Sequence, residues 1–240
     1  MFASGNIISG LDGWGEFAAA LALFFLSHGI SASPRLRQML RHHLGRRCYG
    51  ALYGTLSLII FYWLIQSAGR APYVELWGTA PWQYLVPHIA MPIACLLLAC
   101  GIGVVNPFSL GGTAGPFSPR APGIAGVTRH PLLWAVILWA MAHLFPNGDV
   151  AHLLLFASLG LYGVVGTLLF DARRRAAWGP SQWLAFSAHT SWLPGWALMT
   201  GRWRGDVRQL PWRRLIAAMG LYVGILFSHA IIIGATPRPF

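Results

Sequence analysis

RHPLLWAVILWAMAHLFPNGDVAHLLLFASLGLYGVVGTLLF, residues 129–170, consists of two apolar runs joined by a short polar turn. The turn is PNGD, residues 146–149, and its proline, asparagine and glycine favour a sharp reversal of the chain. Asp149 is placed to cap the helix that follows the turn. The stretch therefore predicts an antiparallel hairpin of two apolar helices, 129–146 and 149–170.

The composition of the whole chain points to a membrane protein. Of its 240 residues 56% are hydrophobic and 10% are charged, whereas a soluble domain has about 25% charged residues. Six segments approach the length of about 20 residues that a membrane-spanning helix needs: 14–33, 49–67, 82–105, 129–146, 149–170 and 214–235. We predict an all-α integral membrane protein, a single domain over 1–240 with about six transmembrane helices in a bundle. The first apolar run follows a start without basic residues, so we expect no cleavable signal peptide.

The basic residues predict the topology. The net charge is +11 and all 17 basic residues are arginine. Most of them lie in the first, third and fifth connections: Arg35, Arg37, Arg41, Arg46, Arg47, Arg120, Arg129, Arg173, Arg174, Arg175, Arg202, Arg204, Arg208, Arg213 and Arg214. The second connection contains only Arg70 and the fourth contains none. The positive-inside rule then places both termini outside the cytoplasm. We attribute the charge to topology and to anionic lipid headgroups, and expect no nucleic-acid partner.

Three features outside the spans complete the organisation. Residues 106–123 are rich in glycine and proline and predict an irregular loop. The segment Trp178–Trp203, interrupted by Pro180 and Pro194, predicts an amphipathic piece at the membrane interface before the last helix. The three cysteines, Cys48, Cys95 and Cys100, have neither the number nor the spacing of a zinc knuckle or a disulfide framework.

Five histidines lie in the predicted spans: His28, His88, His143, His152 and His229. An ionisable side chain inside a membrane is costly and is a functional hypothesis by default. Acidic residues are almost absent from the interior of the spans, where only Glu16 lies. A pathway for protons or cations built from carboxylates is therefore poorly supported.

His130 and His143 bound the helix of the opening stretch and cannot share one ligand, because thirteen helical residues separate them by about 20 Å. His130, followed by Pro131, suits the start of a helix. His143 suits either a hydrogen bond between helices or a metal ligand. Depth in the membrane permits His28, His152 or His229 as its partner. Two imidazoles between apolar walls suit an iron porphyrin better than a hydrated zinc ion.

Three stretches of the chain together resemble a known family: 23–58, beginning LFFLSHGISASPRLRQMLRHHLG; 127–179, VTRHPLLW through DARRRAAWG; and 186–202, FSAHTSWLPGWALMTGR. They are similar to the NnrU family of bacterial integral membrane proteins, which is related to the zeta-carotene isomerase of carotenoid synthesis. The resemblance covers about 14–203 and leaves 204–240 as the last basic loop and the C-terminal helix.

The resemblance implies haem b, with its iron held by His28 in LSHG and His143 in MAHLF. It also implies a place in the bacterial inner membrane and in denitrification and nitric-oxide metabolism. The role would be that of a redox, isomerase-like or accessory factor, so whether the protein is an enzyme stays open and no catalytic residue is assigned. Expected partners are membrane lipids, and a lipophilic substrate or subunits of a denitrification enzyme.

The resemblance further implies a cytoplasmic cluster formed by Arg129, His130, Asp171, Arg173, Arg174, His189 and Thr190, for which structural bracing is an equally good account. One alternative function is methyl transfer, because the RHP motif is similar to one that helps membrane methyltransferases bind S-adenosylmethionine. Those enzymes usually have paired acids in the next cytoplasmic segment, where this chain has only Asp171. The other alternative is a non-catalytic assembly protein.

Overall fold

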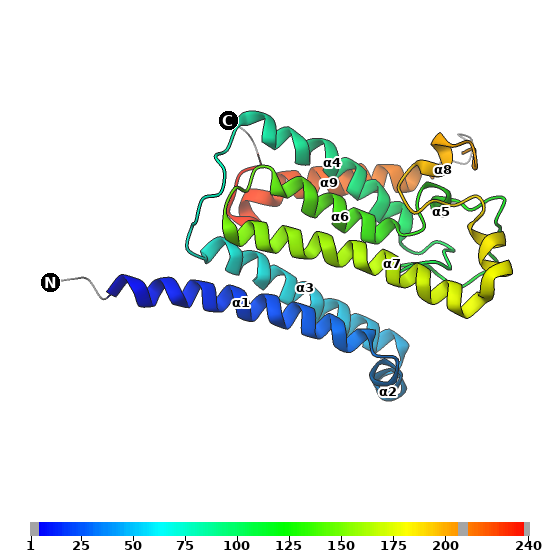
Figure 1. Cartoon of the computed structure of the whole chain (residues 1–240), viewed down its shortest axis with the longest axis horizontal. Helices are drawn as coiled ribbons and strands as arrows, with labels where there is room; N and C mark the ends of the chain where they lie inside the picture. The colour runs from blue at the N-terminus through cyan, green and yellow to red at the C-terminus, as the bar shows by residue number, and fades with distance from the viewer. Residues whose placement is uncertain (1–4, 206–210, 238–240) are drawn as a thin grey trace. The chain divides into compact units, whose positions relative to one another are not determined.

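The computed structural model describes residues 5–205 and 211–237, and these form helices joined by loops with two isolated β-bridges (Figure 1). The helices are α1 (Gly5–Ala32), α2 (Pro34–Leu44), α3 (Arg46–Arg70), α4 (Pro81–Gly101), α5 (Ile124–Val127), α6 (Pro131–Leu144), α7 (Val150–Ser187), α8 (Trp196–Met199) and α9 (Trp212–Ile233). Arg208, which entered the topology argument, and both chain ends lie outside the described residues.

Among the described residues, four helices are long and apolar enough to cross a membrane: α3, α4, α7 and α9. The helix α6 is apolar as well, but it is shorter than a complete span. The prediction of an all-helical membrane protein is therefore confirmed, and the count of about six spans stays a prediction. The loop predicted over 106–123 is also present, since no helix begins between α4 and α5.

Two helices differ from the sequence-based expectation. The arginine-rich segment after the first span was expected to be a loop, but it forms α2, with Pro34 in its first turn and Gly45 at its end. The helix α7 continues well past residue 170 to Ser187, with a break at Gly179, whose φ is 74°. Hydropathy detects only the apolar part of a helix, so it gave no signal for a polar helix or a polar extension.

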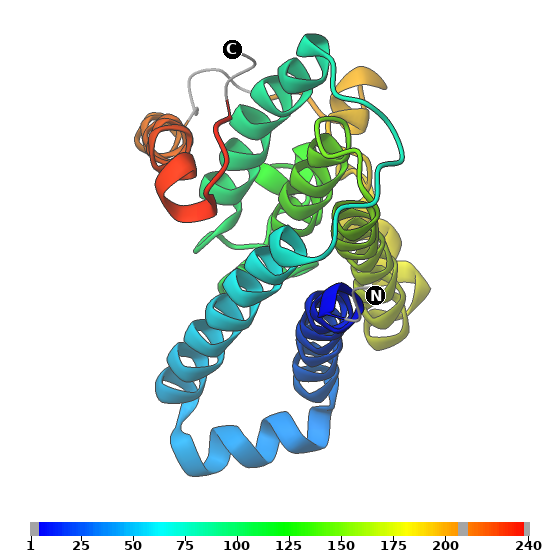
Figure 2. The same ribbon diagram turned by 90° about the vertical axis from the view of Figure 1, so that its left-hand side faces the viewer.

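The described chain divides into two compact units, which we describe separately. The first combines Met1–Gly78 with Asn147–Leu155. In it α1 and α3 lie side by side, and α2 connects their ends (Figure 2). Both long helices bury apolar side chains, among them Phe17 and Leu64. Glu16 of α1 accepts hydrogen bonds from Trp63 Nε1 at 2.9 Å and from Arg70 Nη2 at 2.5 Å.

The turn PNGD belongs to this first unit from Asn147 onward. The carbonyl of Gly148 accepts a hydrogen bond from the backbone N–H of Leu76 at 2.7 Å. A Cβ atom on Gly148 would lie 2.0 Å from the carbonyl oxygen of Trp77, so only glycine fits there. Asp149 Oδ1 accepts a hydrogen bond from the backbone N–H of His152 at 3.1 Å. The predicted cap at the start of α7 is confirmed.

The second unit combines Thr79–Pro146 with Phe156–Phe240. In it α4 lies between α6 and α9, and α6 also packs against α7 (Figure 2). Three glycines of α7 face α6 in reverse chain order: Gly160 faces Met141, Gly163 faces Ile137, and Gly166 faces Leu133. This order confirms that α6 and this part of α7 are antiparallel. The small residues let the two backbones approach closely, as is common between membrane helices.

Candidate functional site

The polar centre of the second unit lies at the end where α5 and α8 are found (Figure 1). Two segments far apart in the sequence are joined there by backbone hydrogen bonds. The N–H of Arg129 donates to the carbonyl of Ser191 at 2.7 Å, and the N–H of Gly195 donates to the carbonyl of Val127 at 2.9 Å. These bonds hold the RHP motif against the segment that follows α7.

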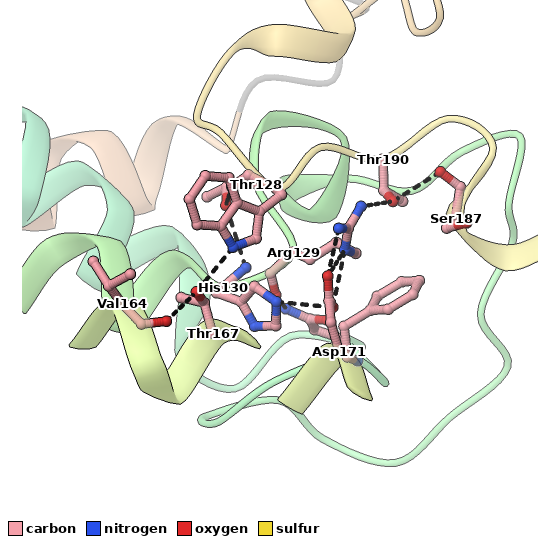
Figure 3. Close-up of polar contacts among 11 residues, drawn as sticks. Thr128, Arg129, His130, Val164, Thr167, Asp171, Ser187 and Thr190 are labelled. Atoms are coloured by element: carbon pink, nitrogen blue, oxygen red, sulfur yellow. Dashed lines mark hydrogen bonds and ion pairs between the residues drawn. The ribbon is translucent and has the colours of Figure 1, made fainter. Parts of the chain in front are cut away.

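Arg129 and Asp171 form a buried ion pair at this end (Figure 3). Nη2 of Arg129 lies 2.5 Å from Asp171 Oδ2, and Nε donates to both carboxylate oxygens at 3.1 and 3.2 Å. Nη1 donates to Thr190 Oγ1 at 3.2 Å. Both charged side chains are 9% exposed. An arginine that donates to both oxygens of one carboxylate forms a stronger and geometrically more specific ion pair than a single hydrogen bond would.

His130 is fully buried beside the same carboxylate. Its Nε2 lies 3.0 Å from Asp171 Oδ1, and because an ionised carboxylate only accepts, Nε2 carries the proton and donates. Its backbone N–H donates to Thr128 Oγ1 at 3.3 Å. Within residues 5–205 and 211–237, its Nδ1 has no hydrogen-bond partner. His130 is thus fixed through one ring nitrogen, and the other is buried without a hydrogen-bond partner among the described residues.

Aromatic rings surround the Arg129 guanidinium. Its central carbon lies 5.4 Å from the centre of the Trp183 ring and 6.0 Å from that of Phe108. Asn106 holds Phe108 beside Arg129, because its Nδ2 donates to the Arg129 carbonyl at 3.0 Å and its Oδ1 accepts from the Phe108 N–H at 3.0 Å. Trp183 is buried against Phe108 and Ala125. This tryptophan of the predicted interfacial segment therefore packs inside the protein.

The structure brings together four of the seven residues predicted for the cytoplasmic cluster: Arg129, His130, Asp171 and Thr190. It also adds Asn106, Thr128 and Ser191, which sequence reasoning missed. The hydroxyl of Ser191 accepts a hydrogen bond from the Ala197 N–H at 2.6 Å. Nothing in the sequence distinguishes these three residues, because the contacts they make depend on long-range pairing of the chain.

The other three predicted members do not join the cluster. Arg173 is exposed. The Arg174 guanidinium lies over Trp178, 5.6 Å from the ring centre. His189 Nδ1 donates to the carbonyl of Arg202 at 2.5 Å. Within the part of the chain that the structure describes, Asp171 forms its ion pairs with Arg129 and His130, and neither Arg173 nor Arg174 joins them.

The two histidines expected to hold haem have the same local geometry in their own units. His28 Nδ1 lies 2.8 Å from the carbonyl oxygen of Phe24, and His143 Nδ1 lies 2.7 Å from that of Trp139. A carbonyl only accepts, so Nδ1 carries a proton in both rings, and Nε2 is the ring nitrogen through which either histidine could bind a metal. Phe24 stacks on His28 at 4.2 Å, and Phe156 lies 5.4 Å from His143, between ring centres.

The remaining histidines of the predicted spans have other backbone or carboxylate contacts. His88 Nδ1 donates to the Tyr84 carbonyl at 2.7 Å, so it repeats the geometry of His28 and His143. His152 Nδ1 lies 2.7 Å from Asp149 Oδ2, and His229 Nδ1 donates to the Ala235 carbonyl at 2.7 Å. Among the described residues, no group of three or more histidine, cysteine or acidic side chains could hold a metal ion.

Comparison with known proteins gives a single assignment. The family model described as NnrU protein matches residues 16–237, which is nearly the whole chain. No curated protein and no solved structure gives a significant match. The matched range contains His28, His143 and the polar cluster, and it reaches beyond residue 203 into the last helix. The chain belongs to the NnrU family.

Proposed function

We propose that this membrane protein binds haem b through His28 and His143 and acts in nitric-oxide or denitrification metabolism as a redox, isomerase-like or accessory factor. One observation carries the proposal. Both rings donate Nδ1–H to a backbone carbonyl four residues earlier, so Nε2 is the nitrogen through which each would bind iron. A neutral imidazole binds a metal through one ring nitrogen, and a hydrogen bond at the other nitrogen orients the ring.

Each of these two histidines has aromatic neighbours within its own unit. Phe24 and Tyr53 lie beside His28, and Trp139 and Phe156 lie beside His143. Flat aromatic rings would suit the faces and edges of a macrocycle, and they would help to exclude water from it. A porphyrin supplies four of the iron ligands itself, so two imidazoles complete the site without a third protein ligand.

Bound haem would supply electron transfer with both histidines in place, or binding of a small diatomic or polyene ligand if one of them is released. His28 and His143 would bind the iron through Nε2, their Nδ1 bonds would orient the rings, and the neighbouring aromatic side chains would keep the surroundings apolar. The arginine-rich connections support a place in the bacterial inner membrane with both termini outside the cytoplasm.

The methyltransferase alternative has less support. Its motif would present Arg129 and His130 to S-adenosylmethionine, but Nε and Nη2 of Arg129 and Nε2 of His130 are used by Asp171. Both residues are also buried. An assembly role without catalysis is compatible with the same haem site and differs only in what the bound haem does.

The test is haem retention by single histidine variants purified in detergent after expression with haem supplied. We expect His28→Ala and His143→Ala to lose most of the haem. His88→Ala is the matched control, because His88 has the same Nδ1 bond and apolar position, and it should keep the haem. Loss in His152→Ala or His229→Ala, with retention in His28→Ala, would move the ligand to that residue. Equal retention in all variants would refute the proposal.

A further inference from the structure

A cavity of about 960 Å³ lies within the second unit, between the end of α4, the start of α9 and the loops beside α5 and α8. These elements come together at one end of that unit (Figure 1). One wall is apolar and includes Ile93, Leu96 and Leu97 of α4 and Leu215 of α9. This cavity is separate from the histidines proposed to hold haem, since neither lines it.

The lining of the cavity also contains cationic side chains. Arg120, Arg204 and Arg214 line it, and no acidic side chain is among the described residues of its lining. Arg214 is fixed in place, because its Nη1 donates to the carbonyls of Ala99 at 2.7 Å and Ile102 at 2.6 Å, at the C-terminal end of α4. Three guanidinium groups can surround one phosphate and donate several charge-assisted hydrogen bonds to it.

The order of these features follows the direction of the two helices. Both α4 and α9 are candidate membrane spans, and the cavity lies where α4 ends and α9 begins. Ile93 precedes Gly101 by eight residues, or about 12 Å along the helix. The wall is therefore apolar inside the span and basic at its end. A bilayer changes from hydrocarbon to charged headgroups over the same short distance.

We propose that this cavity binds an anionic phospholipid, with the phosphate at Arg120, Arg204 and Arg214 and an acyl chain along the α4 wall. The charge decides the class of lipid. A zwitterionic headgroup would bring its own cation to a site that already has three, whereas an anionic headgroup compensates them. Binding would tie the loop that carries Arg120 to the segment that carries Arg204, on either side of α5 and α8.

The first test is native mass spectrometry of the full-length protein with phosphatidylglycerol and phosphatidylcholine. Arg120→Gln/Arg204→Gln removes two charges from the cavity. Arg202→Gln/Arg213→Gln removes two exposed charges that do not line it. We expect the wild type and Arg202→Gln/Arg213→Gln to retain phosphatidylglycerol. Arg120→Gln/Arg204→Gln should bind it more weakly by a factor of about ten or more. Equal weakening in both variants, or equal binding of phosphatidylcholine by the wild type, would overturn the proposal.

A second test needs no arginine substitution. Cys100 lines the cavity, Cys95 is buried, and Cys48 is exposed elsewhere and can be replaced by serine. In Cys48→Ser, phosphatidylglycerol in mixed micelles should slow maleimide labelling of Cys100, and phosphatidylcholine at the same concentration should not. Identical labelling rates with the two lipids would contradict the proposed site, whatever the behaviour of the arginine variants.

Discussion

Asp171→Asn should be the most destabilising conservative change in the polar cluster. Asp171 accepts hydrogen bonds from Nε and Nη2 of Arg129 and from Nε2 of His130, and the two charged side chains are each 9% exposed. Asparagine removes the negative charge and turns a donor NH₂ toward groups that also donate. Breaking a buried ion pair by changing one partner costs about 3–5 kcal/mol. We expect a loss of that size in the free energy of unfolding.

The assay is equilibrium unfolding in mixed dodecyl maltoside and sodium dodecyl sulfate, followed by tryptophan fluorescence. Glu16→Gln is the matched control, because Glu16 also has an arginine partner at 2.5 Å, Arg70, but the Arg70 and Glu16 side chains are 50% and 33% exposed. It should change the midpoint less than Asp171→Asn, since an exposed ion pair contributes little to stability. Arg129→Met/Asp171→Leu should lose less than Asp171→Asn, because no charge is left unpaired. Equal effects of Asp171→Asn and Glu16→Gln would refute this reasoning.

Four further substitutions test helix packing and two hydrogen bonds from backbone N–H groups in the same assay. Gly163→Ala should lower the free energy of unfolding by about 1–2 kcal/mol, because its Cβ would lie 2.7 Å from the Ile137 side chain of α6. Gly160→Ala is the control, because its Cβ would lie 3.5 Å from the Met141 side chain, an ordinary contact distance. It should leave the free energy of unfolding unchanged or raise it by up to about 1 kcal/mol through helix propensity. Asp149→Ala should lose about 1 kcal/mol through the N-cap of α7, and an unchanged midpoint would contradict the cap. Ser191→Ala should lower the free energy of unfolding by about 1–3 kcal/mol, because the Ala197 N–H loses its hydrogen-bond acceptor. A loss no larger than that of a serine-to-alanine change at an exposed position would contradict this expectation.

The apolar helices could be placed from the sequence because two signals agree at their ends. Pro81 and Pro131 stand where the hydropathy rises, and α4 and α6 begin at these residues. The helix α2 has a proline of the same kind, Pro34, but its charged sequence made a loop the more natural expectation. Mean hydropathy detects only apolar segments, so it could not predict the polar extension of α7 beyond residue 170.

The polar cluster was predictable in part. Asp171 is one of only six acids in the chain and lies among arginines, so a contact with the RHP motif was a reasonable expectation. Which arginine it would bind was not readable, because Arg173 and Arg174 are closer to it in sequence than Arg129. The bond of Arg129 N–H to the Ser191 carbonyl spans 62 residues, and only the folded chain places those two groups together.

Binding of haem b by His28 and His143 is tested most directly by absorption spectra of the purified wild-type protein, oxidised and dithionite-reduced, together with a pyridine haemochrome assay. We expect one b-type haem per chain, with the spectrum of six-coordinate, low-spin iron. A folded protein without haem, after expression with haem supplied, would contradict it and return His28 and His143 to hydrogen bonding within the helices.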